Sequence, residues 1–533
     1  MEGRRKESSN LCPGARWWGL GWGFCLFVAL YTLLMGAFQW WVMTGRDDVK
    51  FMLWMGEFMG RDATDGISNI GLGFSFEGLR AYIQELRMLE NGRITSWVAP
   101  LFTAYCPQWV RAAIYGLSAG VMMLMAGKLS ISYGSGVSEE TPEISEERRW
   151  IIPACVALGV VTLLPWRDGM AYFAFGLNYV TESVLMLAAI WLICRIKMEA
   201  KWWMWPALMI LVWLTARIHE GFGLPLLAGM VTALKFKDLR TKPLYWLTLT
   251  VLLAANCLTA INPAVSRRLA QVAGEVVFSQ TSLIKFAVKG ILVEGIVAAW
   301  IVMLCSQKWR RKLRRLVDDP VALICAVTML GSYAISLKML GGHRSLWCAN
   351  LMAIILMAKM IDFPVWKRWK VVAGMVYAVL LIFLVSVVCR QRMLWQQDKE
   401  IMELYKVSST GTVYYDIIEF PRLSDWGYTT ADRWRKKDCH EGYNCYSSLS
   451  AGIFTVVPTA LEGFEGSRWE KCIIETSEGE IEAMDVKGVL LAERSELQRF
   501  NPEEEKSMIN MGSYQAMPFI AGDGQLYYYL VRF

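Results

Sequence analysis

The sequence contains only three histidines among 533 residues and no phosphate-binding glycine motif. One histidine begins the dipeptide His219-Glu220. A zinc-protease motif needs a second histidine one helical turn later, where this chain has Gly223. The stretch 71–78 contains glycines, but it does not follow a strand as the nucleotide-binding fingerprints require. These absences argue against a zinc protease of this type and against a Walker-type or dinucleotide-binding enzyme.

Charged residues are also scarce, at 19% of the chain, whereas hydrophobic residues reach 55% and the mean hydropathy is +0.32. This composition, with 25 tryptophans, is typical of a membrane protein rather than a soluble one. A membrane-spanning helix needs about 20 apolar residues, or fewer where the protein thins the bilayer. The sequence predicts a polytopic α-helical membrane protein with about eleven spans, at residues 17–43, 108–126, 150–166, 170–194, 203–216, 221–234, 243–261, 283–305, 321–337, 346–360 and 371–389.

The first apolar run resembles a signal peptide because Arg4, Arg5 and Lys6 precede it. It is too long for one, and no cleavage site of small residues follows it. We therefore expect an uncleaved anchor whose N-terminus lies inside. Basic residues concentrate in the loops that then fall inside, as the positive-inside rule requires. The net charge of +7 therefore reports topology rather than nucleic-acid binding.

Orientation depends on the apolar stretch 203–234, which is either one long helix or a helical hairpin. Each half has only about 14 residues, or about 21 Å of helix. A single helix would place the basic cluster 310–315 outside. The positive-inside rule therefore favours the hairpin, with His219-Glu220 at its outer tip.

Three parts follow from this topology. Residues 1–390 form a membrane domain, within which 44–107 is a large first outer loop with amphipathic, interfacial segments at 51–59 and 79–89. Residues 391–533 form an extracytoplasmic α/β or mostly β domain, with strands expected at 412–418, 452–457, 472–475, 486–491 and 525–533. In an oxidising compartment Cys439 and Cys445 of this domain could form a disulfide. A metal knuckle with His440 is disfavoured because a fourth ligand is missing.

Polar and charged residues gather at the outer ends of the spans, which predicts a water-filled site facing outward. Asp47-Asp48 follow the first span directly. They either anchor or cap helices there, or one of them serves as a general base for an acceptor hydroxyl. His219-Glu220 at the hairpin tip is either part of the same chemistry or a structural pair with Arg217 or Arg267.

Cations at outer span ends suit a phosphate ligand because arginine binds phosphate oxygens bidentately. Membrane-interface snorkelling is the alternative explanation. Asn178-Tyr179 and Glu182, inside the fourth span, suit either sugar hydroxyls or a helix–helix hydrogen bond. The expected phosphate- and substrate-binding residues are Arg93, Asn178, Arg267, Arg268, Lys338, His343 and Arg344.

The order of these motifs carries a resemblance. In sequence they are Asp47-Asp48, Asn91-Gly92-Arg93, Asn178-Tyr179, His219-Glu220, Asn262-Pro263 with Arg267, and the late Arg344. Over roughly residues 17–390 this order resembles the GT-C superfamily of polytopic membrane glycosyltransferases, and most closely a bacterial branch related to it. Asn262-Pro263 departs from the Pro-Gly-Asn-like turn expected in that branch.

The resemblance implies transfer of a sugar from a polyprenyl-phosphate donor to a glycan, lipid or protein acceptor, with inversion at the sugar. It makes Asp47 or Asp48 the candidate base and assigns Arg267, Arg268 and Arg344 to the donor phosphate. A divalent cation at the aspartates, joined by His219 or Glu220, stays open as a cofactor. The implied location is a bacterial inner membrane.

Two other classes also fit the sequence. A transporter or flippase for lipid-linked glycans would use a similar cationic cavity, although the repeated halves typical of transporters are not evident. A non-catalytic membrane assembly protein would work through its C-terminal domain and leave the outer acids dispensable.

Overall fold

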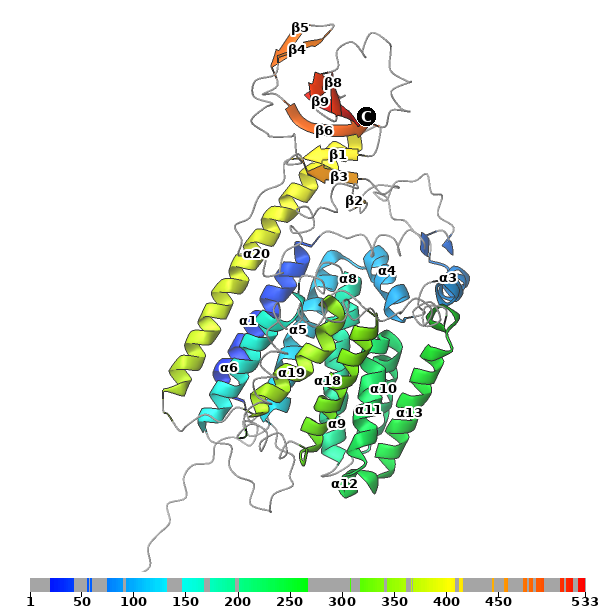
Figure 1. Ribbon diagram of the computed structural model, residues 1–533, viewed down its shortest axis with the longest axis vertical. Helices are drawn as coiled ribbons and strands as arrows, with labels where there is room; N and C mark the ends of the chain where they lie inside the picture. Colours follow the sequence, from blue (N-terminus) through cyan, green and yellow to red (C-terminus); the bar gives the residue numbers. More distant parts are fainter. Residues whose placement is uncertain are drawn as a thin grey trace, which may run out of the picture.

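The computed structural model describes residues 20–42, 55–56, 58–59, 74–89, 93–131, 146–166, 173–196, 201–266, 307, 317–339, 343–360, 366 and 368–407, and nine strands between 412 and 532 (Figure 1). Of residues 146–148, 337–339, 343, 344, 394 and the described residues after 396, only the backbone path is described. The helical segments are α1 (Trp22–Trp40), α3 (Phe76–Leu89), α4 (Thr95–Tyr105), α5 (Gln108–Ile131), α6 (Glu146–Leu163), α8 (Phe173–Phe175), η2 (Gly176–Thr181), α9 (Glu182–Ile196), α10 (Met204–Ile218), α11 (Glu220–Ala233), α12 (Lys237–Arg240), α13 (Pro243–Ala260), α18 (Pro320–Met339), η3 (His343–Leu346), α19 (Trp347–Met360) and α20 (Trp369–Val407).

Five helices in the described part of the chain are long and apolar enough to cross a membrane: Trp22–Trp40, Gln108–Ile131, Phe173–Ile196, Pro243–Ala260 and Trp369–Met393. Five shorter apolar helices are Arg149–Leu163, Met204–Ile218, Glu220–Ala233, Pro320–Ser336 and Trp347–Met360. All of them overlap spans expected from the sequence, and the remaining expected span, 283–305, lies outside the described residues. The chain is thus a helical protein of membrane type.

Contacts between helix ends show that successive helices alternate in direction. The Gln108 side chain donates to the Trp40 carbonyl, which joins the start of α5 to the end of α1. At the other end of α1, the Gly21 N–H donates to the Arg149 carbonyl, which joins the start of α1 to the start of α6. The bundle therefore has two ends. We name them the His219 end (Trp40, Gln108, Asn178, His219, Thr259) and the Asp319 end (Gly21, Arg149, Arg195, Lys235, Asp319, Lys359).

Several of the basic residues expected inside lie at the Asp319 end in the part of the chain that the structure describes. Lys128 and Arg195 both lie over the ring of Trp191, at 5.0 and 4.8 Å from its centroid. Lys235 is 3.7 Å from Asp318 at the start of α18. Lys128, Arg195 and Lys235 thus share one end of the bundle, and the membrane face at each end stays a prediction.

The chain reverses at His219, which confirms the helical hairpin. His219 has extended backbone angles (φ −150°, ψ 125°) between α10 and α11. A Cβ on Gly223 would lie 2.6 Å from the Ala216 Cα, so the two arms touch near the tip. The Tyr245 hydroxyl donates to the Met230 carbonyl at 2.5 Å, which places the start of α13 beside the far end of α11.

Close glycine packing joins α1 to α5. A Cβ on Gly116 would meet the Thr32 carbonyl oxygen at 2.6 Å and the Gly36 Cα at 2.9 Å. Gly116 and Gly120 form a small-xxx-small pattern of the kind that lets membrane helices approach closely. Sequence composition alone did not identify this interface.

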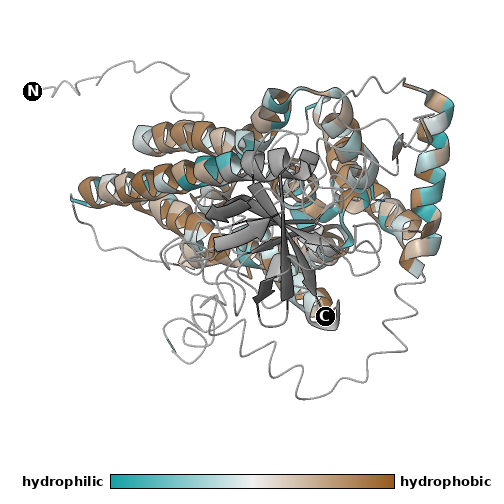
Figure 2. Cartoon of the chain, turned by 90° about the horizontal axis from the view of Figure 1, so that it is seen from above, coloured by the Kyte–Doolittle hydropathy of each residue, from teal (hydrophilic) through white to brown (hydrophobic). Residues whose placement is uncertain are grey.

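The helix α3 begins at Phe76, three residues before the expected amphipathic segment 79–89. Its Tyr82 and Leu86 pack with Met55 and Met59, whereas Phe76 and Leu89 are exposed. Figures 1 and 2 show α3 lying across the bundle axis at one edge of the molecule, with hydrophilic and hydrophobic residues mixed along it. This is the arrangement expected of an interfacial helix.

The last helix differs from its expected length. The helix α20 has 39 residues, whereas the sequence predicted a span at 371–389. The expected domain boundary at residue 390 therefore falls inside a continuous helix. At 1.5 Å per residue its length is about 58 Å, well beyond the roughly 30 Å of a bilayer core.

Strands follow α20 and are drawn beyond its far end in Figure 1. They are β1 (Thr412–Tyr415), β2 (Tyr443–Asn444), β3 (Thr455–Pro458), β4 (Ile473–Thr476), β5 (Gly479–Glu482), β6 (Val486–Ala492), β7 (Ile509–Met511), β8 (Tyr514–Ile520) and β9 (Leu526–Arg532). One sheet has the mixed order β2-β3-β1-β6-β9-β8-β7, with β1–β3 and β6–β9 parallel, and β4-β5 pair separately. Cys439 and Cys445 lie outside the described residues, so their disulfide stays a prediction.

Candidate functional site

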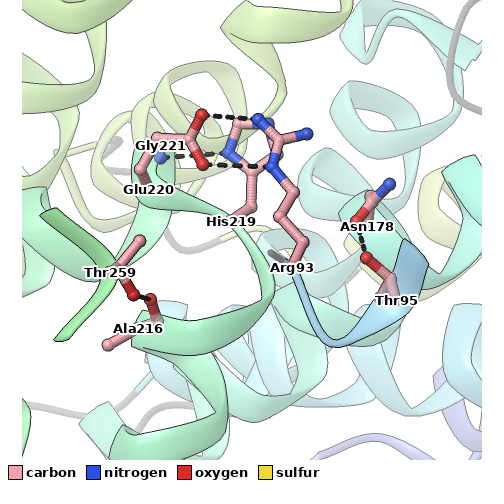
Figure 3. A network of polar contacts seen from close by, with 8 residues as sticks. All are labelled: Arg93, Thr95, Asn178, Ala216, His219, Glu220, Gly221 and Thr259. Carbon is pink, nitrogen blue, oxygen red and sulfur yellow. Dashed lines mark hydrogen bonds and ion pairs between the residues drawn. The ribbon is translucent and has the colours of Figure 1, made fainter. Parts of the chain in front are cut away.

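An ion pair at the His219 end joins two segments that are 127 residues apart in sequence. The Arg93 Nε donates to the Glu220 Oε2 at 3.1 Å, and the Nη2 donates to the Oε1 (Figure 3). This fork is the bidentate geometry that makes arginine–carboxylate pairs strong and directional. The side chains are 16% and 25% exposed, so the pair lies near the surface but is largely desolvated.

The chain before α4 places Arg93 on the hairpin tip. The Ile94 N–H donates to the Arg217 carbonyl at 3.2 Å, directly beside the ion pair. One residue further on, the Thr95 hydroxyl donates to the Asn178 Oδ1. Burial lowers the pKa of Arg93 and is the largest single cause, but the charge and hydrogen bonds of Glu220 together with Tyr179 and Glu182 raise it by more, so the net shift is upward and the guanidinium stays charged.

His219 caps the helix that begins at Glu220. Its Nδ1 accepts a hydrogen bond from the Gly221 N–H at 3.0 Å, which satisfies one of the unpaired donors of the first helical turn. The accepting Nδ1 carries no proton in this arrangement. The ring centroid lies 5.4 Å from that of Tyr179 and 5.9 Å from that of Phe222. A capping role is thus established by geometry, while a catalytic role stays a prediction.

Arg217 was one of two structural partners considered for Glu220, and the structure places it elsewhere. Its Nη1 donates to the Thr259 hydroxyl at 3.1 Å. That hydroxyl donates to the Ala216 carbonyl at 3.0 Å (Figure 3). These bonds join the hairpin to the end of α13. The described partner of Glu220 is Arg93, which the sequence assigned to substrate binding.

The helix carrying Asn178 contains a π-helical segment, η2. Single π-helical turns within α-helices occur frequently at functional sites. Asn178 is 8% exposed and Glu182, the residue after this segment, is 0% exposed. Neither Glu182 oxygen has a hydrogen-bond partner among the described residues. The His219 backbone N–H lies near this carboxylate without meeting hydrogen-bond geometry.

The structure therefore brings together four of the residues predicted from the sequence: Arg93, Asn178, His219 and Glu220. The other candidates are not placed. Asp47, Asp48, Arg267 and Arg268 lie outside the described residues, and for Lys338, His343 and Arg344 the backbone path alone is described. The backbone of η3 does lie near this site, because the next residue, Trp347, donates from its Nε1 to the Ser183 hydroxyl at 3.0 Å.

Two residues that take part in these contacts could not be predicted from the sequence. Thr95 and Thr259 carry no motif, and threonine is common in membrane helices, so only the packing reveals their contacts. Among the described residues no group of three or more histidine, cysteine, aspartate or glutamate side chains could hold a metal ion. The divalent cation considered at Asp47-Asp48 falls outside that part of the chain and stays untested.

A crevice of about 490 Å³ lies beside this site, between α3 and the segment after α13. It is lined by Phe58, Ala81, Gln84, Glu85, Arg87, Met88 and Pro263. Its mixed polar and apolar lining is accessible from the surface.

No protein-family model matches the chain, and no curated protein matches it.

Proposed function

We propose that the chain is a membrane glycosyltransferase that moves a sugar from a polyprenyl-phosphate donor to a glycan, lipid or protein acceptor. The observation that supports this best is the convergence of Arg93, Asn178, His219 and Glu220 at one end of the bundle. These residues come from distant segments, and the polar motifs expected outside are among them. The proposed site lies where the first outer loop meets the hairpin tip.

The topology of the proposal follows from charge. Because basic residues gather at the Asp319 end, the positive-inside rule makes that end cytoplasmic and the His219 end extracytoplasmic. About eleven spans, an N-terminus inside and a C-terminal domain outside complete this arrangement. The proposed location is a bacterial inner membrane, and the membrane lipids are direct partners.

In the proposed reaction Asp47 or Asp48 accepts the proton of an acceptor hydroxyl. The hydroxyl oxygen forms a bond to the anomeric carbon from the face opposite the phosphate. The bond from that carbon to the phosphate oxygen breaks, and the polyprenyl phosphate leaves with the electron pair. A phosphate leaving group needs no strong general acid, and cationic side chains stabilise its developing charge.

Donor phosphate binding is assigned to Arg267, Arg268 and Arg344, with Lys338 and His343 as further candidates. Arg93 is not assigned to the donor phosphate, because its guanidinium already forms two hydrogen bonds with Glu220. Binding phosphate would require that buried pair to open and leave Glu220 without its cation. Arg93 is therefore proposed to hold the first outer loop on the hairpin tip.

The test replaces Asp47 and Asp48 by asparagine, singly and together, in cells whose protein level is checked by immunoblot. Glu77→Gln, an exposed acid on α3 in the same outer loop, is the matched control. If the chain is a glycosyltransferase, one sugar is expected to disappear from the surface glycans of the Asp variants and not of the control. Accumulation of complete lipid-linked glycan inside would indicate a flippase, and unchanged glycans would indicate an assembly protein.

A further inference from the structure

Glu182 is a buried carboxylate that the His219 end does not satisfy. It is 0% exposed, and neither of its oxygens finds a hydrogen-bond donor within the described residues. It belongs to the helix that also carries Asn178, four residues earlier, so the two side chains lie about one turn apart on the same face. Buried carboxylates without donors are costly and rare.

In the part of the chain that the structure describes, the charges around Glu182 do not balance. Arg93 contributes one positive charge, and its fork is engaged with Glu220. Both glutamates lie within electrostatic range of that guanidinium. The described groups facing Glu182 are Arg93 from the loop before α4, Glu220 and the backbone of His219 from the hairpin, and the Cys348 thiol of α19. Among the described residues, one cation therefore lies near two carboxylates.

The two carboxylates and the one described cation determine which ligands could bind beside Glu182. A phosphate placed between Glu182 and Glu220 would add negative charge beside two carboxylates, and the described guanidinium there is already forked to Glu220. A metal ion would need further ligands, and the described residues offer no group of three suitable side chains. A neutral ligand with hydroxyl groups would supply the missing donors without adding charge.

Asn178 complements such a ligand. Its Oδ1 accepts from the Thr95 hydroxyl, which orients the amide so that its NH₂ points away from Thr95 (Figure 3). An amide NH₂ donates two hydrogen bonds, whereas an ionised carboxylate accepts only. A hydroxyl can donate to the carboxylate while a neighbouring ring oxygen accepts from the amide. Adjacent hydroxyls of a sugar ring offer this combination of donors and acceptors.

We propose that Glu182, together with Asn178, binds the hydroxyl groups of a sugar ring that enters from the His219 end. This inference rests on the proposed function and adds to it a specificity residue for the sugar. The Arg93–Glu220 pair is more exposed than Glu182 and lies nearer the surface.

The experiment uses the purified full-length chain in a detergent without sugar, probed with methyl glycosides of glucose, galactose, mannose and their N-acetylamino analogues. Binding is read from intrinsic tryptophan fluorescence and from the unfolding temperature. At least one glycoside is expected to bind the wild-type chain, and Glu182→Gln is expected to weaken it tenfold or more, because a hydrogen bond to a charged group is lost. Glu77→Gln is expected to bind as the wild type does.

Glutamine has the shape of a protonated glutamate, so a purely structural, protonated Glu182 predicts unchanged binding in Glu182→Gln. Unchanged binding would overturn the inference. So would a wild-type chain that binds no glycoside, or one stabilised through Glu182 by magnesium rather than by a sugar.

A measurement on the wild-type chain tests the same inference if the Glu182→Gln variant does not fold. Dicyclohexylcarbodiimide modifies carboxyl groups in apolar surroundings, and mass spectrometry identifies the modified peptide. The bound glycoside is expected to protect Glu182 and not Glu77, and equal modification with and without the glycoside contradicts the inference. Loss of the inference leaves the proposed function standing, because the surface-glycan test depends on Asp47 and Asp48 instead.

Discussion

The two ends of the helical bundle each hold an ion pair that is largely shielded from water, but the carboxylates around the two pairs differ in how completely they are hydrogen-bonded. At the Asp319 end the Lys359 Nζ lies 2.9 Å from the Asp319 Oδ2, with side chains 4% and 11% exposed. The other Asp319 oxygen accepts from the Val321 N–H at 2.9 Å, so both oxygens of this carboxylate have a donor. At the His219 end Arg93 satisfies Glu220 and leaves Glu182 without a donor among the described residues.

The difference separates a structural pair from a candidate binding site. A buried charge is tolerated when its partner and its remaining hydrogen bonds are complete, as they are for Asp319. An incomplete arrangement costs stability, and natural proteins retain such costs mainly at functional sites. Both pairs join helices, so the number of donors for each carboxylate, rather than burial alone, is the informative quantity.

The largest expected effect is at the Asp319 end. Lys359→Met removes the cation and leaves Asp319 buried without it, which should lower the free energy of unfolding by about 3–5 kcal/mol. Lys235→Met is the control, because its pair with Asp318 is 41% and 82% exposed and contributes about 1 kcal/mol or less. Unfolding of the purified variants in detergent, followed by circular dichroism, measures both. Equal losses in the two variants would remove the distinction between them.

A smaller effect is expected at His219 and separates capping from chemistry. His219→Ala removes the cap of α11 and should lower the free energy of unfolding by about 1 kcal/mol. Asparagine is a good N-cap residue, so His219→Asn should keep most of that stability. If His219 also takes part in the reaction, His219→Asn loses glycan transfer while its unfolding temperature stays near that of the wild type. Normal transfer in a stable His219→Asn chain assigns the residue to capping alone.

The smallest effect has the opposite sign. Glu182→Met replaces an unsatisfied buried carboxylate by an apolar side chain of similar length, and should leave stability unchanged or raise it by about 1 kcal/mol. Asp319→Leu is the matched change at the other end and should destabilise, since it leaves Lys359 buried without its anion. Thermal unfolding of the two variants in parallel checks the contrast. A marked loss in Glu182→Met would show that Glu182 is satisfied after all.

Several features of the fold could be predicted because each depends on a short stretch of sequence. The apolar runs that form α1, α5 and α13 are recognisable from composition over about 20 residues. The reversal at His219 followed from basic residues in nearby loops, which constrain the parity of the spans. The length of α20 could not be predicted in the same way, because hydropathy reports where apolar residues end and not where a helix ends.

The site was predicted as a set of residues and not as a set of contacts. Sequence order placed Arg93, Asn178, His219 and Glu220 at one end, and the structure describes them there. The partner of Glu220 was expected to be Arg217 or Arg267 and is Arg93 among the described residues. Nothing local to Glu220 indicates a partner 127 residues earlier, because that choice depends on how the outer loop packs on the hairpin.

The sequence by itself determined that this is a helical chain of membrane type, where its apolar helices lie and which residues share an end of the bundle. Hydrophobicity and loop charge act over one span, so they can be read without the fold. Only the tertiary structure decided that Arg93 is committed to Glu220, that Asn178 is oriented by Thr95, and that Glu182 lacks a donor within the described residues. Hydrogen bonds and ion pairs require atoms within about 3 Å of one another, and distant segments reach that separation only through packing.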